Sequence, residues 1–310
     1  LSTVDQACYI AKSKGRNRIH TFQPGDNESS RWHNEMQWVP HINQALDDGH
    51  FILFAQPIAT IGKSEDKYSH YEILLRMKSE DGNLIAPGSF LPSAERYGLM
   101  PTLDRWVVGK AIEMLAAAWK NNPNFAMDTF GINISGAVLG DNSLLKFVKQ
   151  ALSGYGLPPS LLCFEITETV AIANFTHAHR FVNELKEMGC RFALDDFGSG
   201  FASFSYLKTL PVDYLKIDGS FVRHLSQSAV DHTMVDAINQ LGHVMGLKTI
   251  AEFVETQDVL ESLRILDVDY AQGYYIGRPI PLQEVCYAVE NVVADDGSSK
   301  VGNSTAALSM

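Results

Sequence analysis

The sequence lacks the marks of a membrane-spanning, secreted or disulfide-stapled protein. None of its 310 residues falls in a run approaching the roughly 18 to 20 consecutive apolar residues of a transmembrane helix. The N-terminus has no charged-then-apolar signal-peptide pattern. The cysteines are scattered, without a C-x-x-C pair or a spacing typical of disulfide frameworks: Cys8, Cys163, Cys190 and Cys286. We therefore expect a soluble domain in the reducing cytoplasm.

Positive charge is also scarce. Lysine and arginine number 25 against 36 aspartates and glutamates, which gives a formal net charge of −11. This balance argues against a broad electrostatic footprint for duplex nucleic acid or anionic lipid. A small anionic ligand is compatible with it only if metal ions cancel carboxylates locally.

The glycine-rich loops of nucleotide-binding folds are missing as well. Gly62-Lys63-Ser64 has Pro57 where a P-loop requires its first glycine, and no G-x-G-x-x-G follows the first strand-like segment. P-loop and dinucleotide-binding functions are therefore disfavoured.

Eight strand-like segments alternate with amphipathic helical patterns along most of the chain. This alternation over about 250 residues predicts an α/β fold of the TIM-like (β/α)8 barrel type, with an open doubly wound sheet as the alternative. The predicted strands are 51–58, 70–77, 130–135, 162–167, 191–195, 214–218, 249–254 and 270–276.

The two ends differ from this pattern in composition. Residues 1–23 contain an amphipathic helix, a glycine stop and a short strand, which are too little for a core and predict the end of an upstream domain. Residues 24–34 have the composition of a linker, 35–290 hold the predicted barrel, and 291–310 have that of a mobile tail.

Acids and amides gather at the ends of the predicted strands, where barrels of this class place their active sites. Carboxylates that converge on one pocket repel one another unless cations pair them. Oxygen ligands without cysteine or clustered histidine favour Mg²⁺ or Mn²⁺, and two such ions sharing a carboxylate are suited to phosphodiester hydrolysis. The polar residues at these strand ends, with Lys216 as the one cation, are Glu72, Asn133, Glu165, Glu168, Asp195, Asp196, Lys216, Asp218, Glu252, Glu255 and Gln272.

Each of these residues also has an ordinary structural explanation. A single acid at a strand end is more often a helix N-cap or a surface charge. Asp195 and Asp196 precede Gly198 and Gly200 and could cap the next helix, and Lys216 could pair with Asp218. The prediction of a metal site would be wrong only if all of these explanations held at once, at successive strand ends.

These strand-end residues resemble those of a known family, the EAL domains that hydrolyse cyclic di-GMP. The resemblance covers about residues 35–290, and seven motifs occur in the family's order. They are Glu72-Ile73-Leu74-Leu75-Arg76 (E-A-L-x-R), Asn133-Ile134-Ser135 (N-x-S), Glu165-Ile166-Thr167-Glu168 (E-x-T-E), Asp195 to Gly200 (D-D-F-G-T-G), Lys216-Ile217-Asp218 (K-x-D), Glu252 to Glu255 (E-G-V-E) and Gln272-Gly273 (Q-G).

The resemblance implies a role for each matching residue. Lys216 would position or deprotonate the attacking water, Glu252 would assist as a further metal ligand, and Glu168 would tether the loop 197–205, which in the family helps shape the metal site and couples it to a dimer partner. The implied ligands of two Mg²⁺ or Mn²⁺ ions are Glu72, Asn133, Glu165, Asp195, Asp196 and Glu252. The implied substrate contacts are Gln56, Leu75, Arg76, Glu255 and Gln272.

The sequence departs from the family pattern at three positions. Ile73 replaces the alanine of E-A-L and should point away from the metals, because successive strand residues alternate. Ser199 keeps the hydroxyl of the threonine that it replaces. Phe253 replaces the glycine of E-G-V-E, and a large ring there is expected to affect strand packing or substrate access.

The activity implied by the resemblance is hydrolysis of cyclic di-GMP to linear pGpG, which lowers a second messenger of biofilm formation and motility. A homodimer through the EAL domain and inhibition by Ca²⁺ are expected with it. Residues 1–23 resemble the end of a GGDEF domain, which implies a tandem protein with upstream sensor domains. Such a full-length protein could be anchored to the inner membrane. The alternatives are a catalytically silent cyclic di-GMP receptor and an enolase-like or aldolase-like barrel that uses Lys216 on a carbonyl substrate.

Overall fold

The computed structural model describes residues 27–61, 70–79, 81–121, 129–200 and 206–292. The predicted upstream remnant, 1–23, and almost all of the predicted tail, 291–310, lie outside these residues. Helix α2 (Asn27–Asp47) is the first described element, so the part of the predicted linker that the structure describes is helical. Within the described residues, no helix combines the length and apolarity needed to cross a membrane.

The eight predicted strands close into a barrel. The hydrogen-bonded order is β1-β9-β8-β7-β6-β5-β4-β2, and β2 pairs again with β1 to complete the ring, which rules out the open sheet. Two short strands, β3 (Leu84–Ile85) and β10 (Ile280–Pro281), pair outside the ring. The barrel strands are β1 (Phe51–Thr60), β2 (His70–Lys78), β4 (Thr129–Asn133), β5 (Leu162–Thr167), β6 (Arg191–Phe197), β7 (Tyr214–Ile217), β8 (Lys248–Ala251) and β9 (Tyr270–Gln272).

The first strand differs from a regular (β/α)8 barrel in its direction. β1 runs antiparallel to both of its barrel neighbours, β2 and β9, whereas the other neighbouring strands are parallel. The β1–β2 register, from Phe51↔Met77 to Ile58↔His70, places Gln56 opposite Glu72. The reversed strand therefore still delivers a polar side chain to the barrel end that holds the predicted site.

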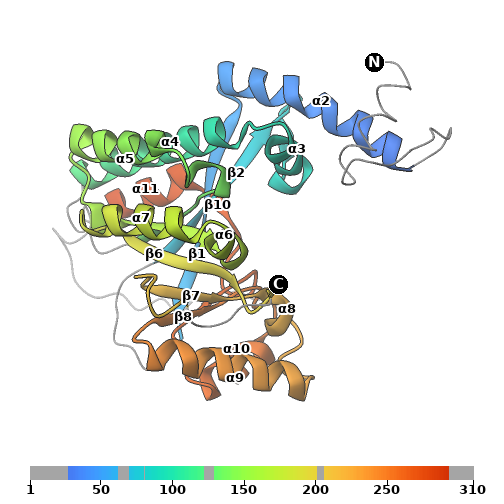
Figure 1. The fold of residues 1–310 in the computed structure, drawn as a ribbon, viewed down its shortest axis with the longest axis vertical. Coiled ribbons are helices and arrows are strands. Elements are labelled where there is room, and N and C mark those ends of the chain that lie inside the picture. The colour runs from blue at the N-terminus through green and yellow to red at the C-terminus, as the bar shows by residue number, and fades with distance from the viewer. Residues whose placement is uncertain (1–26, 62–69, 80, 122–128, 201–205, 293–310) are drawn as a thin grey trace, which may run out of the picture.

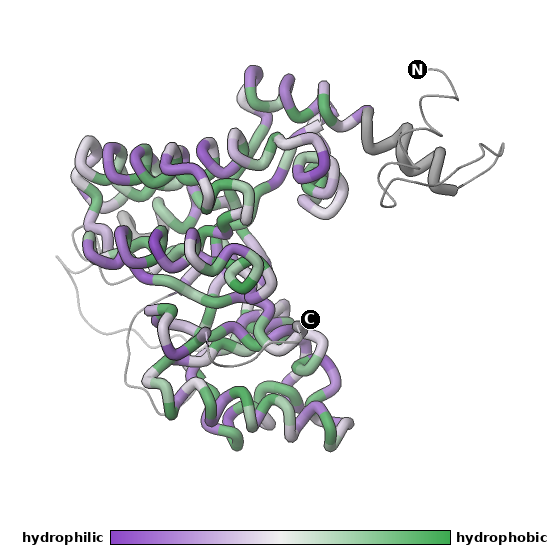
Figure 2. The backbone as a smooth tube through the Cα atoms, in the orientation of Figure 1, coloured by the Kyte–Doolittle hydropathy of each residue, from purple (hydrophilic) through white to green (hydrophobic). Residues whose placement is uncertain are grey.

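Amphipathic helices cover the outside of the barrel. In Figure 1, α4, α5 and α7 lie on one side of the strands and α9 and α10 on the other. The coloured tube of Figure 2 shows hydrophobic and hydrophilic residues alternating around these helices, as expected for one buried face. The helices are α3 (Leu91–Arg96), α4 (Met100–Asn121), α5 (Asn142–Tyr155), α6 (Glu168–Ala173), α7 (Phe175–Lys186), α8 (Gly219–Val222), α9 (Ala229–Val244), α10 (Gln257–Ile265) and α11 (Leu282–Val292), with 3-10 turns η1 (Pro87–Ser89), η3 (Gly136–Val138) and η4 (Pro159–Leu161).

The inside of the barrel is divided into two layers by the alternation of side chains along each strand. The lower layer is a small core of Ile58, Cys163, Ala193, Tyr214, Ile250 and Tyr270. Two residues further along, toward the C-terminal ends of the parallel strands, the same face carries Glu165, Asp195, Lys216, Glu252 and Gln272. The pleat thus places the predicted site directly above an apolar floor.

Candidate metal centre and adjoining cavity

Lys216 lies at the middle of the upper layer and is completely buried. Its Nζ atom lies 2.7 Å from Glu165 Oε2, 2.8 Å from Glu252 Oε1, 3.2 Å from Asp195 Oδ1 and 3.5 Å from Glu72 Oε2. Four strands, β2, β5, β6 and β7, and the segment after β8 supply these groups. The structure therefore gathers the predicted lysine and four of the predicted ligands, and it does not pair Lys216 with Asp218.

Two amide side chains hold Glu72 from the other side. Asn133 Nδ2 donates to Glu72 Oε1 at 2.6 Å, and Gln272 Nε2 donates to Glu72 Oε2 at the same distance. Gln56 Oε1 also accepts from Gln272 Nε2, at 3.3 Å. The buried Oε1 atom of Gln272 accepts no hydrogen bond from the described residues, which leaves an acceptor for a ligand.

Gly131 makes room for this arrangement. A Cβ atom at this position would lie 1.9 Å from Glu165 Oε1. Because β4 and β5 pair in parallel with Gly131 opposite Cys163, only glycine lets the Glu165 carboxylate enter the layer at this height.

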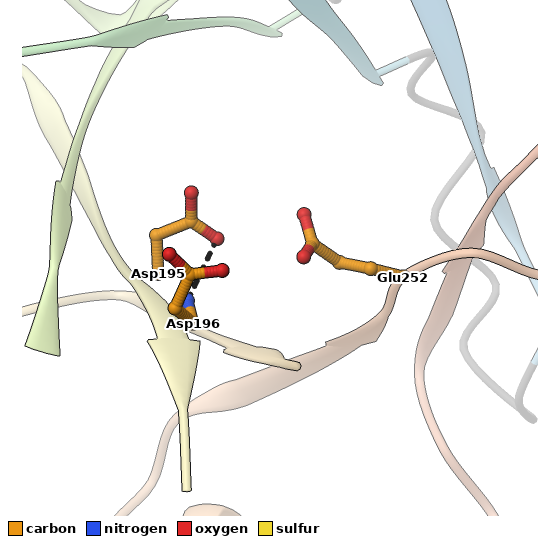
Figure 3. Close-up of side chains that lie close together, drawn as sticks. All are labelled: Asp195, Asp196 and Glu252. Atoms are coloured by element: carbon orange, nitrogen blue, oxygen red, sulfur yellow. Dashed lines mark hydrogen bonds between the residues drawn. The ribbon is translucent and has the colours of Figure 1, made fainter. Parts of the chain in front are cut away.

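Asp196 reaches the same centre as Asp195 although the two are adjacent in sequence. A regular strand would turn them to opposite faces. The pairing of β6 with β7 shifts register between Leu194 and Phe197, and Asp196 has a left-handed backbone with φ of 52°. Ligand oxygens of Asp195, Asp196 and Glu252 consequently lie within 4.8 Å of one another. Figure 3 shows the side chain of Glu252 pointing toward those of Asp195 and Asp196.

Burial and charge perturb the titration of this cluster. Burial raises the pKa of Glu252 to about 8 and that of Asp196 to about 6, and neighbouring carboxylates add to both shifts. Burial opposes ionisation of Glu72 too, but the charge of Lys216 and the amide hydrogen bonds outweigh it and lower its pKa. The pKa of Lys216 is raised well above its ordinary value, because its four carboxylate neighbours outweigh its burial. Lys216 is therefore a fixed positive charge that forms ion pairs with several carboxylates at once.

The donor set suits hard divalent cations. It consists of carboxylate and amide oxygens, several of them buried. Cations would offset both the burial that raises the pKa of Glu252 and Asp196 and the mutual repulsion that adds to it. Asp218 is instead a helix N-cap, the ordinary structural role considered for a strand-end acid. Its Oδ1 atom accepts a hydrogen bond from Ser220 N at 2.7 Å and caps α8.

Glu168 forms a clamp beside the metal-ligand candidates. It is 1% exposed, its Oε2 atom accepts from Gly198 N at 2.9 Å, and its Oε1 atom accepts from Tyr206 Oη at 2.7 Å. These two partners flank the segment 201–205, which lies outside the described residues. Glu168 thus joins the chain on both sides of that segment to the start of α6.

A cavity of about 380 Å³ adjoins the carboxylate layer. It brings together Glu72, Glu252 and the predicted substrate residues Gln56, Arg76, Glu255 and Gln272. Leu75 is not among the lining residues, because it lies on the opposite face of β2 in the core under the helices. Leu74 lines the cavity instead, together with Phe253 and Tyr274, and the strand period of two could have shown that Leu74 shares the face of Glu72 and Arg76.

The three residues that depart from the family pattern have different environments. Ile73 packs in the helix-facing core, as predicted. Ser199 Oγ donates to the backbone oxygen of Asp196 at 2.8 Å. Phe253 has a left-handed backbone with φ of 54°, which costs a side-chain-bearing residue roughly 1–2 kcal/mol.

Asp104 is a buried acid that the strand-end pattern could not find, because it lies on helix α4. Its Oδ2 atom accepts from Ser135 Oγ at 2.5 Å and from Ser135 N at 3.3 Å. It thereby fixes the backbone two residues after Asn133, one of the predicted ligands. Burial raises the pKa of Asp104 to about 6.

We expect Asp104→Asn to change the pH dependence of stability. The raised pKa means that the folded state binds this proton more tightly, so ionisation destabilises the fold as pH rises from about 4 to 6. The asparagine keeps an acceptor for Ser135 and carries no charge. The free energy of unfolding of the variant, relative to that of the wild type, should therefore increase over that range by at most about 3 kcal/mol. Urea unfolding at a series of pH values measures this difference.

Asp141→Asn is the control with the opposite sign. Asp141 caps α5 through Ser143, and its hydrogen bonds with that residue lower its pKa, so its contribution is present above its pKa and is lost as pH falls. A pH-independent difference between Asp104→Asn and the wild type would contradict the assignment of a raised pKa to Asp104.

The fold and the site define a closed α/β barrel with a cluster of acidic residues, suited to hard divalent cations, at the C-terminal ends of its parallel strands. The chain belongs to the EAL domain family, whose model matches residues 40–279. It is 40% identical over 294 residues to the cyclic di-GMP phosphodiesterase PdeB of Shewanella oneidensis, which covers 95% of this chain and 34% of that protein. With the cyclic di-GMP phosphodiesterase PdeF of Escherichia coli it shares 38% identity over 251 residues, 81% of this chain and 33% of that protein.

Solved structures agree with this assignment. The PaMucR phosphodiesterase in complex with c-di-GMP superposes with a TM-score of 0.72 at 33% identity, covering 80% of this chain and 99% of that one. The FimX EAL domain from Pseudomonas aeruginosa bound to c-di-GMP gives 0.71 at 31% identity, covering 78% and 96%. The resemblance to EAL domains is confirmed, and the chain spans about a third of the length of the two curated relatives.

Proposed function

We propose that this domain hydrolyses cyclic di-GMP to linear pGpG. The observation that carries the proposal is the convergence of Lys216 with four carboxylates beside a cavity that contains Arg76. The names of the relatives PdeB and PdeF support the same substrate. By this activity the protein would lower a second messenger that controls biofilm formation and motility.

Two Mg²⁺ or Mn²⁺ ions are the proposed cofactors, and they would supply a nucleophilic water at neutral pH and offset charge on the phosphate. Glu72, Asn133, Glu165 and Asp195 would hold one, Asp195 and Asp196 the other, with Glu252 as a further ligand. Ca²⁺ should inhibit, because it accepts looser geometry than the smaller ions.

The other residues act on the substrate and on the proton balance. Lys216, positively charged among its acids, would hold the attacking water in position by donating a hydrogen bond. Arg76 offers its planar donors to a phosphate oxygen. Gln56, Glu255 and Gln272 would contact guanine and ribose, and Glu168 would hold the loop between Gly198 and Tyr206 in the active arrangement.

The wider setting is also part of the proposal. Because the curated relatives are about three times as long, we place this domain in a longer protein with an upstream GGDEF or sensor region, acting in the cytoplasm as a homodimer through the EAL domain. Anchoring of the whole protein to the inner membrane is compatible with that arrangement.

We expect the chain to convert cyclic di-GMP to pGpG with Mg²⁺ or Mn²⁺, and Glu72→Ala to reduce the rate at least about a hundredfold, because Glu72 is both a proposed ligand and a partner of Lys216. Products are separated by chromatography after timed incubation. Glu113→Ala is the matched control, since Glu113 is half exposed on α4 and pairs only with Lys110 among the described contacts.

Two results would redirect the proposal. Binding of cyclic di-GMP without cleavage, in either metal, would favour the receptor function for this chain. Cleavage that persists in chelator or in Glu72→Ala would contradict the metal mechanism while leaving the substrate assignment in place.

A further inference from the structure

Phe253 is the strained residue of the cavity wall. It follows Glu252 directly and has a left-handed backbone, a conformation that glycine adopts without steric cost. The residue is 46% exposed and lines the cavity with Glu72, Arg76, Glu255 and Gln272. A glycine would relieve the backbone strain here, and a half-exposed ring recovers only part of the stabilisation of a buried one. An outlier of this kind at a ligand cavity points to a role in the site.

The short helix α8 is shaped to receive the ring. A Cβ atom at Gly219 would lie 2.1 Å from Phe253 Cδ2 and 2.7 Å from its Cγ, so the ring occupies the space that a side chain at 219 would fill. At the C-cap position of the helix, four residues after Gly219, the guanidinium of Arg223 lies 4.2 Å from the centre of the ring. Gly219 and Arg223 together fix the ring in one orientation at the cavity.

An aromatic ring held in this way offers a surface for stacking. Arg223 lies over one face of the ring, and its positive charge is attracted by the π-electrons of that face. Flat heteroaromatic rings stack on exposed aromatic side chains with little dependence on base identity, since every base has a π-face. The carboxylates on the cavity wall offer only polar oxygen atoms and do not supply such a surface.

We propose that Phe253 is a substrate-positioning residue that stacks on one purine base of the cyclic dinucleotide, with Gly219 and Arg223 holding its ring in place. The inference rests on the proposed function, because it assigns the base contact within the same site. It makes the residue that departs from the E-G-V-E motif a part of substrate recognition in this chain.

The test compares steady-state kinetics of four proteins on cyclic di-GMP with Mg²⁺: the wild type, Phe253→Leu, Phe253→Trp and the control Tyr155→Leu. Tyr155 is an exposed aromatic residue at the end of α5, away from the cavity lining. Loss of one stacked base should raise KM about tenfold in Phe253→Leu with kcat within about twofold, whereas Phe253→Trp keeps a stacking ring and the wild-type KM. Tyr155→Leu should leave both constants unchanged.

A double substitution tests the supporting contacts. Gly219→Ala should displace the ring and raise KM in the otherwise wild-type chain. In a Phe253→Gly background, the same substitution should add no further change, because the atoms with which the new methyl group collides are gone. Thermal melts of every variant show that each is folded.

The outcomes separate this inference from the function on which it rests. If the wild type cleaves cyclic di-GMP and Phe253→Leu retains its KM, or if the variants change only the melting temperature, the stacking role is wrong and the phosphodiesterase function stands. If the wild type neither binds nor cleaves cyclic di-GMP, both fail together.

Discussion

Lys216→Met is expected to reduce cleavage of cyclic di-GMP by at least about a thousandfold and to destabilise the metal-free protein. The Nζ atom of Lys216 lies within 3.5 Å of oxygens from Glu72, Glu165, Asp195 and Glu252. Methionine is close to lysine in length but carries no charge or donor. Its introduction would leave these acids buried without the cation that pairs them, and removal of one partner from a buried ion pair costs about 3–5 kcal/mol.

The stability effect is measured by urea unfolding in chelator, and the catalytic effect by product formation with Mg²⁺ in excess. Lys110→Met is the matched control, because Lys110 pairs with Glu113 on the exposed side of α4 and its loss should cost less than about 1 kcal/mol. A Lys216→Met protein that unfolds like the wild type in chelator would show that its acids take up protons at no cost to the fold. Such a result would refute the ion-pair role of the lysine.

The second large effect is expected for Asp195→Asn. Asp195 is the proposed bridging ligand and lies with Asp196 and Glu252 in the cluster whose oxygens are within 4.8 Å of one another. Asparagine has nearly the same shape but one anionic oxygen fewer to share between two cations. We expect turnover to fall at least about a thousandfold and metal binding to weaken strongly.

Thermal melts give a measurement of metal binding that does not depend on turnover. Metal at about a hundred times its dissociation constant should stabilise the wild type by about 2.7 kcal/mol, which corresponds to a rise in Tm of about 5 to 10 °C for a domain of this size. Asp195→Asn should lose most of that rise. Asp258→Asn, at an exposed position in the first turn of α10, should retain it. An equal rise in the wild type and Asp195→Asn would exclude Asp195 as a ligand.

The sequence by itself determined which segments become strands and which residues reach the site. All eight predicted strands are present, because runs of β-branched and aromatic residues between turn signals leave few other structures for such segments. The sequence also allowed most of the site residues to be selected, namely Glu72, Glu165, Asp195, Lys216, Glu252 and Gln272. Strand ends in a barrel converge at one end, so a polar residue there has a predictable neighbourhood.

Only the tertiary structure decided how these side chains are oriented. The place of the reversed β1 in the ring depends on its pairing with β9, which is more than 200 residues away in sequence, as well as with the adjacent β2. The arrival of Asp196 beside Asp195 depends on a left-handed residue at a register shift, which overrides strand alternation. Motif position selected Leu75 as a substrate contact, whereas the pleat of β2 places Leu75 in the core and Leu74 at the cavity.

Phe253 most clearly separates what the local sequence specifies from what tertiary contacts decide. Its sequence position marks it as a departure from the motif, but the space left by Gly219 and the contact with Arg223 come from α8 and its C-cap residue, at least 30 residues earlier in the chain. Local sequence specifies backbone preferences and the periodicity of faces. The ion pairs around Lys216 and the support of the Phe253 ring are contacts between distant segments, and these are specified only when the barrel closes.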